Sequence, residues 1–172
     1  MRMAKQTRDE GFTEYVASRS GWLRKVAYLL CGDWHRADDL VQETITKLYV
    51  NWARAGRVEN LDGYARRVLV NTFLGEQRTA WWRRTVRTDS EPDTPAVGLD
   101  LDTALDLRRA LAALPPRQRA TVVLRYYCDL SIDQAAEALD CSPGNVKSQS
   151  SRALEALRRT LVPHPSVAER TS

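Results

Sequence analysis

The sequence predicts an all-α protein made of two small helical domains joined by a flexible acidic linker. Apolar residues recur at intervals of three or four along most of the chain, which indicates amphipathic helices, and no stretch alternates as strands do. From Thr88 to Asp100 this periodicity stops, and prolines, a glycine and acidic residues accumulate, as in a linker. The predicted parts are an amino-terminal domain (1–87), the linker (88–100), a carboxy-terminal domain (101–161) and a disordered tail (162–172).

The composition is that of a globular protein with a modest excess of positive charge. A length of 172 residues suits one ordinary domain or two small ones, and a net charge of +4 with a pI near 9.1 favours a polyanionic partner. No apolar run has the length of a membrane span, and the first residues lack the apolar core of a signal peptide, so we expect a cytoplasmic protein without membrane contact. Cys31, Cys128 and Cys141 have no C-x-x-C spacing, which predicts free thiols.

Two helices are expected first. One begins at Phe12, is interrupted near Ser20-Gly21 and ends at Gly32, and Asp33 can cap the next. The second helix has the clearest apolar face of the chain, which we assign to the core: Ala37, Leu40, Val41, Ile45, Leu48, Tyr49 and Trp52.

The opposite face of this second helix is acidic near its start, where carboxylates also favour the helix dipole. It carries Asp38, Asp39, Gln42 and Glu43. His35 stands three and four residues before the two aspartates, so a metal half-site is conceivable. A helical carboxylate metal centre needs a matching set from another helix, which the sequence does not offer. We therefore predict a solvated or partner-facing acidic surface.

A polar loop, Ala55 to Gly63, precedes the next helix, for which Asp62 is the expected N-cap. Its core face carries Ala65, Val68, Leu69 and Thr72. Its other face and its end mix basic with aromatic residues: Arg66, Arg67, Asn71, Arg78, Trp81, Trp82, Arg83, Arg84 and Arg87. Cations that follow phosphates and rings that stack on unpaired bases are typical of a single-stranded nucleic acid surface. The alternative is that one or both tryptophans close the core while the arginines are merely solvated.

The carboxy-terminal domain is expected to end in a helix-turn-helix, from Ser131 to Arg159. Ser131 and Gln134 form a capping box for its first helix, and Ser142 with Pro143 begins the second. Two preceding helices cover its apolar side with residues on either side of Pro115-Pro116: Leu107, Leu111, Leu114, Ala120, Val123, Leu124 and Tyr127.

The second helix of this motif presents residue types that suit a DNA major groove. Asn pairs with adenine edges, Lys or Arg with guanine, and Ser with phosphate or base. The outward residues near its start are Asn145, Lys147, Ser148, Ser151 and Arg152. The alternative is an ordinary αα-hairpin with a solvated polar face.

Four segments together resemble the extracytoplasmic-function (group 4) bacterial sigma factors of the sigma-70 family. They are GDWHRADDLVQET (Gly32 to Thr44), GYARRVLVNTFLGEQR (Gly63 to Arg78), LPPRQRATVVLRYYCDLS (Leu114 to Ser131) and GNVKSQSSRALEALR (Gly144 to Arg158). The resemblance implies a sigma region 2 in the first domain and, in the second, a four-helix, winged-helix-like region 4. The implied partners are core RNA polymerase, through its β′ clamp helices and β flap, and promoter DNA. Many members of the family also bind an anti-sigma factor.

The resemblance also implies a role for each candidate residue. Polymerase docking falls to Asp38, Asp39, Gln42 and Glu43. Recognition and melting of the minus-10 element fall to Asn60, Tyr64, Arg67, Asn71, Arg78, Trp81, Trp82, Arg83 and Arg84. Recognition of the minus-35 element falls to Ser142, Asn145, Lys147, Ser148, Ser151 and Arg152.

Two residues depart from the family pattern. Asp140 stands where a glycine with positive φ is usual, and Asp tolerates that conformation better than most residues. Ser150 stands where many relatives have a larger apolar residue, beneath the predicted recognition helix.

The predicted function is that of a sigma factor that binds core RNA polymerase and directs promoter-specific transcription initiation. We expect no enzymatic activity and no cofactor, because no paired acid and base, activated nucleophile or phosphate-binding glycine loop is evident. The first alternative is a stand-alone helix-turn-helix regulator that binds an operator without polymerase. A protein-interaction scaffold built on the acidic helix face is the second, and a metal-dependent enzyme is the weakest.

Overall fold

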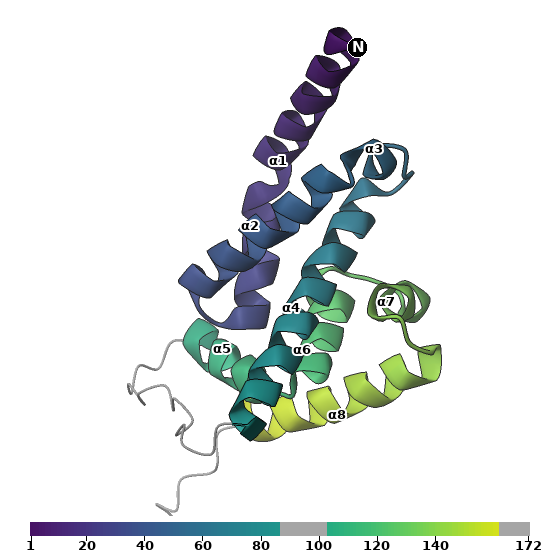
Figure 1. Cartoon of the computed structure of the whole chain (residues 1–172). Helices are drawn as coiled ribbons and strands as arrows, with labels where there is room; N and C mark the ends of the chain where they lie inside the picture. The colour runs from purple at the N-terminus through teal and green to yellow at the C-terminus, as the bar shows by residue number, and fades with distance from the viewer. Residues whose placement is uncertain (87–102, 162–172) are drawn as a thin grey trace, which may run out of the picture.

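The computed structural model describes residues 1–86 and 103–161, and all regular structure in these ranges is helical. The expected linker and the tail from residue 162 lie outside the described residues. In chain order the elements are α1 (Arg2–Cys31), α2 (Trp34–Val50), α3 (Trp52–Ala55), α4 (Leu61–Val86), α5 (Thr103–Ala113), α6 (Pro116–Val122), the π-helical turn η1 (Val123–Tyr127), α7 (Ile132–Leu139) and α8 (Pro143–Leu161) (Figure 1). None of the described helices combines the length and the apolar character needed to cross a lipid bilayer.

Helix α1 is longer and more regular than predicted. It begins at Arg2 and continues through Gly21 without a break. Glycine in a helix interior costs about 1 kcal/mol relative to alanine, and the burial of the last turns of α1 against the core outweighs that cost. The predicted stop is confirmed, because Gly32 has φ 72° and its N–H donates to the Tyr28 carbonyl at 2.7 Å.

Helix α2 begins as predicted and buries a slightly different set of residues. The Asp33 side chain accepts hydrogen bonds from the His35 and Arg36 amides at 2.7 and 3.2 Å. Tyr49 is 43% exposed, so its assignment to the core is wrong. The helix ends one residue later, and Trp52 starts the short helix α3, where it is buried against the edge of Phe12.

Helix α4 is capped by Asn60 rather than by Asp62. The helix begins at Leu61, and the Asn60 side-chain oxygen accepts a hydrogen bond from the Gly63 amide at 2.8 Å. Asp62 lies in the first turn, where its carboxylate binds the Tyr15 hydroxyl at 3.0 Å and Arg19 at 2.6 Å. Asn60 and Asp62 are both residue types that cap helices. Because Asp62 contacts Tyr15 and Arg19 of α1, the cap position is left to Asn60.

The helices before the helix-turn-helix pack on it through Leu111, Leu114 and other buried residues. Leu107 and Tyr127 were predicted for this core, but they are 42% and 47% exposed. For Tyr127 the cause is η1: the Cys128 amide donates to the Val123 carbonyl five residues back, which widens the turn and rotates the following residues away from the core.

The helix-turn-helix has the predicted caps. The Ser131 hydroxyl accepts from the Gln134 amide at 3.1 Å, and the Gln134 side chain accepts from the Ser131 amide at 2.9 Å. The Ser142 hydroxyl caps α8 by accepting from the Asn145 amide at 3.1 Å. Asp140, between the two helices, has φ 51° and ψ 54°, which is the left-handed conformation expected at this turn.

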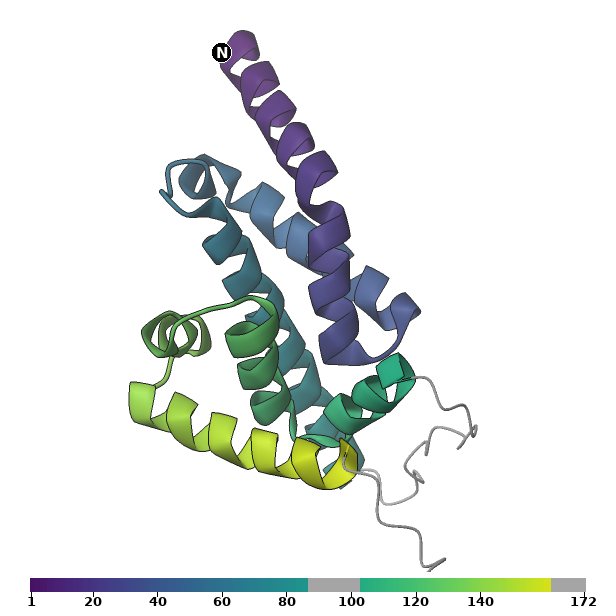
Figure 2. The same ribbon diagram turned by 180° about the vertical axis from the view of Figure 1, so that it is seen from behind.

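The first half of the chain (residues 1–86) and the second half (residues 103–161) pack against each other. Helix α7 lies beside the first turns of α4, and α6 lies against α4 further along (Figures 1 and 2). Buried residues of both halves, among them Leu30 and Phe73 from the first and Leu124 and Ala135 from the second, form one apolar cluster. The orientation of the halves is therefore fixed by a shared core.

Two arginines of the second half contact the carboxyl end of α1. Arg119 donates to the Leu30 carbonyl at 2.6 Å, and Arg108 lies 3.4 Å from both the Gly32 carbonyl and the Tyr28 hydroxyl. Cations are favoured at a helix carboxyl end, where carbonyls lack partners and the helix dipole is negative.

Candidate functional site

The predicted polymerase-docking residues Asp38, Asp39, Gln42 and Glu43, called the acidic surface below, lie on one side of α2. All except Asp38 are exposed, and Asp38 is half-buried. Arg24 of α1 donates to both oxygens of the Asp38 carboxylate, at 2.6 and 3.4 Å. This hydrogen bond lowers the pKa of Asp38. The Asp38 carboxylate is therefore already paired within the chain.

Arg24 is in turn held by aromatic rings. Its guanidinium lies 4.3 Å from the centre of the Trp34 ring, and Trp34 stacks on Tyr28 with ring centres 3.9 Å apart. A cation over an aromatic face is attracted by the ring quadrupole. Neither Arg24 nor Trp34 was predicted from the sequence, because Arg24 of α1 meets Asp38 of α2 in a tertiary contact that no local spacing indicates.

Glu43 contacts α4 as well as its own helix. It forms an ion pair with Lys47 at 3.2 Å, and Lys47 donates to the Thr72 hydroxyl at 3.0 Å. Interaction with Glu76 lowers the pKa of Glu43, whereas burial and the neighbouring Glu43 raise the pKa of Glu76. Within residues 1–86 and 103–161, no three or more His, Cys, Asp or Glu side chains are grouped so as to hold a metal ion.

The predicted minus-10 residues, called the basic-aromatic surface below, follow α4 from its cap to its last turns. They are Asn60, Tyr64, Arg67, Asn71, Arg78, Trp81, Trp82, Arg83 and Arg84. Trp81 and Trp82 are 63% and 64% exposed, with ring centres 6.4 Å apart, so the alternative in which a tryptophan closes the core is wrong for both. Arg67, Asn71, Arg78 and Arg83 are exposed as well. Arg84 lies in α4, and its side chain is outside the described residues.

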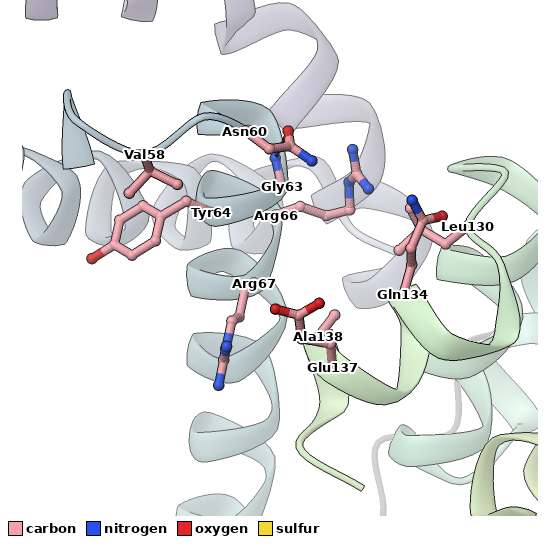
Figure 3. Close-up of a pocket in the computed structure, with 10 residues that line it drawn as sticks. All are labelled: Val58, Asn60, Gly63, Tyr64, Arg66, Arg67, Leu130, Gln134, Glu137 and Ala138. Carbon is pink, nitrogen blue, oxygen red and sulfur yellow. Dashed lines mark hydrogen bonds between the residues drawn. The ribbon is translucent and has the colours of Figure 1, made fainter. Parts of the chain in front are cut away.

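A cavity of about 300 Å³ lies between the start of α4 and α7. It is lined by residues of both halves: Val58, Asn60, Gly63, Tyr64, Arg66, Arg67, Leu130, Gln134, Glu137 and Ala138 (Figure 3). Arg66 lies over the Trp22 ring at 5.3 Å, and its Nε is buried without a hydrogen-bond partner. This cavity was not predicted from the sequence, because its two walls are far apart in the chain.

The predicted minus-35 residues, called the recognition surface below, lie at the start of α8: Ser142, Asn145, Lys147, Ser148, Ser151 and Arg152. All are exposed. The opposite side of the helix is buried through Val146, Ser150, Ala153 and Leu157. Because the buried stripe fixes the rotation of the helix, its polar side chains point to solvent as one group.

The three cysteines are free thiols, as predicted, and each is half-buried. Burial raises the pKa of the Cys31 thiol to about 11 and also raises that of Cys128. A raised thiol pKa lowers the thiolate fraction at neutral pH and with it the reactivity.

Comparison with known proteins identifies two family regions along the chain. Residues 15–83 match the family described as Sigma-70 region 2, and residues 104–157 match Sigma-70, region 4. The chain is 39% identical over 158 residues to the RNA polymerase sigma-E factor of Streptomyces coelicolor, covering 88% of this chain and 86% of that protein. It is 32% identical over 148 residues to the ECF RNA polymerase sigma factor SigL of Mycobacterium tuberculosis strain H37Rv, covering 81% and 82%.

A solved structure has the same fold. The sigma factor RpoE, in a co-crystal structure with the anti-sigma factor NepR from Bartonella quintana, matches with a TM-score of 0.71 and 27% identity, over 88% of this chain and 97% of that one. The two region matches, the relatives and the shared fold lead to one conclusion: the chain belongs to the extracytoplasmic-function sigma factors of the sigma-70 family.

Proposed function

We propose that this chain binds core RNA polymerase and directs it to promoters, with a separate surface for each step. Its relatives are named RNA polymerase sigma factors. The acidic and basic-aromatic surfaces belong to the part of the chain that matches region 2, and the recognition surface belongs to the part that matches region 4. The amino-terminal domain (1–87) contains the first two surfaces and the carboxy-terminal domain (101–161) contains the third.

The acidic surface docks on the polymerase. Asp39, Gln42 and Glu43 are exposed on a rigid helix, and a basic or amide-rich helix pair on the polymerase is the complementary partner. Asp38 contributes through its bidentate pair with Arg24, which presents a fixed carboxylate and guanidinium together.

The basic-aromatic surface holds the unpaired minus-10 strand. Exposed arginines attract phosphates, and Trp81 and Trp82 present two ring faces to unpaired bases. Stacking of a base on an aromatic side chain contributes about 1–3 kcal/mol and tolerates any base, so sequence preference must come from other contacts.

The recognition surface binds the duplex minus-35 element in the major groove. The observation that carries the whole proposal is this face of α8, where exposed polar and basic side chains stand opposite a buried apolar stripe, behind the capped turn of a helix-turn-helix. By analogy with the RpoE–NepR complex, we add an anti-sigma factor to the partners proposed for this chain.

In vitro transcription tests the proposal. Core polymerase is incubated with a library of genomic promoter fragments, with and without the protein, and the run-off products are sequenced. We expect new start sites that share two spaced upstream motifs. A charge-reversed variant, D38K/D39K, should lose these starts while its helical content stays unchanged.

The opposite outcome is equally informative. If no new starts form with active core polymerase, while the folded protein alone binds a specific duplex and D38K/D39K binds it equally well, the chain is a stand-alone regulator and the proposal fails.

A further inference from the structure

The acidic surface is continuous with an exposed tryptophan at the start of α2. Trp34, Asp38 and Gln42 stand four residues apart in turn, so their side chains form one row along the helix. Trp34 is 41% exposed. A single exposed apolar residue is ordinary on a protein surface, so exposure alone gives Trp34 no role. Its contacts with other side chains are more informative.

The Trp34 ring is held by two side chains of α1 that stand one helical turn apart. Tyr28 stacks on it, with ring centres 3.9 Å apart and ring planes 8° from parallel. The Arg24 guanidinium lies 4.3 Å from the centre of the Trp34 ring. A planar guanidinium over an aromatic face is attracted by the ring quadrupole and loses part of its rotational freedom. Trp34 therefore restricts where the Arg24 side chain can point.

Arg24 connects this aromatic pair to the acidic surface. Its Nε donates to one oxygen of Asp38 at 2.6 Å, and one of its terminal nitrogens donates to the other oxygen at 3.4 Å. The side chains of this ion pair are 48% and 50% exposed. A pair so exposed is ordinarily weak, because two long side chains must lose conformational freedom to form it. Contact with Trp34 reduces that cost, because it restricts Arg24 before the pair forms.

The charge of Arg24 is opposite to the charge that attraction of a basic partner requires. A guanidinium at the Asp38 carboxylate cancels much of the negative charge and weakens the attraction of that carboxylate at long range. If Arg24 acted through its charge alone, the acidic surface would bind a basic partner more tightly without it. Any benefit of Arg24 to docking must therefore come from the orientation that it gives to Asp38.

We infer that Trp34 and Arg24 are positioning residues for polymerase docking: Trp34 holds Arg24, and Arg24 fixes the Asp38 carboxylate for a contact with a hydrogen-bond donor of the polymerase. The polymerase half of this inference rests on the proposed function. Asp38 and Asp39 then have different roles, although they are neighbours. Asp39 is exposed and attracts a basic partner over a distance, whereas Asp38 makes a short and oriented contact.

Binding of the full chain to immobilised core RNA polymerase, measured by biolayer interferometry, tests the docking role. Arg24→Ala and Trp34→Ala should both weaken binding, and loss of the cation–π contact alone corresponds to about a two- to fivefold change. Trp34→Phe keeps an aromatic ring at the guanidinium and should recover much of the loss. Lys25→Ala removes an equal charge from an exposed neighbour on α1 and should not weaken binding. Tighter binding of Arg24→Ala would overturn the inference, because Arg24 would then act through its charge alone.

The same substitutions in an Asp38→Ala background decide whether the two residues act through Asp38. Once the carboxylate is absent, Trp34→Ala should have no further effect on polymerase binding, and Arg24→Ala should no longer weaken it. The difference between the two backgrounds is the coupling energy of a double-mutant cycle. An undiminished effect of Trp34→Ala in the Asp38→Ala background would mean that Trp34 contacts the polymerase directly, which overturns its positioning role.

A measurement on the free protein separates this inference from the proposed function. The hydrogen bond from Arg24 lowers the pKa of Asp38, and the charges of Arg24 and His35 lower it further. Trp34→Ala should therefore raise the pKa of Asp38 toward its ordinary value, and Trp34→Phe should raise it much less. Carbon-detected NMR titration of the Asp38 carboxyl measures this change, and an unaltered pKa of the Asp33 cap shows that the start of α2 is intact.

The two measurements have separate failures. An Asp38 pKa that is the same in Trp34→Ala as in the wild type would overturn the positioning, whether or not the chain binds polymerase. If the pKa shifts as expected but the wild type does not bind core polymerase, the proposed function fails, and the docking role of Trp34 and Arg24 fails with it.

Discussion

At the scale of single residues, the two departures from the family pattern have different consequences. Asp140 adopts the left-handed conformation that the turn requires, which an aspartate tolerates at moderate cost. Ser150 is 9% exposed, and its hydroxyl is buried without a hydrogen-bond partner. A buried polar group without a partner loses its hydration and gains nothing in return. Ser150 is therefore a weak point beneath the recognition helix.

Replacing Ser150 with alanine should stabilise the protein. The change removes the unpaired hydroxyl and leaves almost the same volume, so we expect the free energy of unfolding to rise by about 1 kcal/mol. Urea unfolding measures it, with Ser151→Ala, an exposed neighbour on the same helix, as the control. A loss of stability in Ser150→Ala would show that the hydroxyl has a partner after all.

Acid should destabilise the protein partly through Asp33 and Asp38. Backbone hydrogen bonds from Arg36 and His35 lower the pKa of Asp33, and Arg24 lowers that of Asp38. A carboxyl whose folded pKa lies below its unfolded value of about 3.9 contributes stability above that pH and loses it as the pH falls through the folded pKa.

The matching measurement is urea unfolding between pH 5 and pH 3 at constant ionic strength. Asp33→Asn and Asp38→Asn should each lose less stability over this range than the wild type, because neither retains the titrating group. Asp133→Asn is the control for removal of one exposed carboxylate, and a slope equal to this control would contradict the assignment.

At the scale of elements, local signals predicted the caps and the turns, and long-range contacts decided the rest. Asp33, Ser131 and Ser142 cap their helices as expected, because each bond is formed within three residues. The choice of Asn60 over Asp62 depends on Tyr15 and Arg19, more than forty residues away. The exposure of Tyr127 follows from the π-helical turn, which no spacing rule indicates.

Loss of the capping box should weaken the helix-turn-helix. Ser131→Ala removes the acceptor for the Gln134 amide, which should lower the free energy of unfolding by about 1 kcal/mol. Chemical unfolding measures it, and Ser131→Thr should recover much of the loss. A change equal to that of the exposed-site control Ser148→Ala would mean that the box contributes little.

The exposed face of α8 gives a prediction about specificity. If Arg152 contacts a base edge, Arg152→Ala should weaken minus-35 recognition by about 1–3 kcal/mol and relax the preference at one position. Transcription from a set of single-base promoter variants measures this preference. Arg158→Ala, near the end of the same helix, is the control, and an unchanged minus-35 preference would assign the contact to another residue.

At the scale of the whole molecule, the sequence predicted two domains but not their contact. The family resemblance divides the chain at residues 88–100, and nothing in that division indicates that Leu30 and Leu124 share a core. The contacts of Arg108 and Arg119 with α1 span more than seventy residues. Such contacts depend on three-dimensional shape, and a single sequence contains no periodic signal for them.

The shared core predicts cooperative unfolding. All five tryptophans lie in the first half, so tryptophan fluorescence reports on that half alone, whereas far-UV circular dichroism reports on both. We expect the two probes to give the same urea midpoint in the wild type, because the halves unfold together. Distinct midpoints in the wild type would mean that the halves unfold independently.

The position of α4 restricts which substitutions this helix can accept during evolution. Helix α4 packs against α1 and α2 on one side and against α6 and α7 on the other, and its remaining face is the basic-aromatic surface. Few substitutions in α4 are neutral, because a side chain that fits against one packed helix also affects another packed helix or the bound DNA strand. In a lineage of such proteins, α4 should therefore change most slowly, and its changes should be accompanied by compensating changes in the second half of the chain.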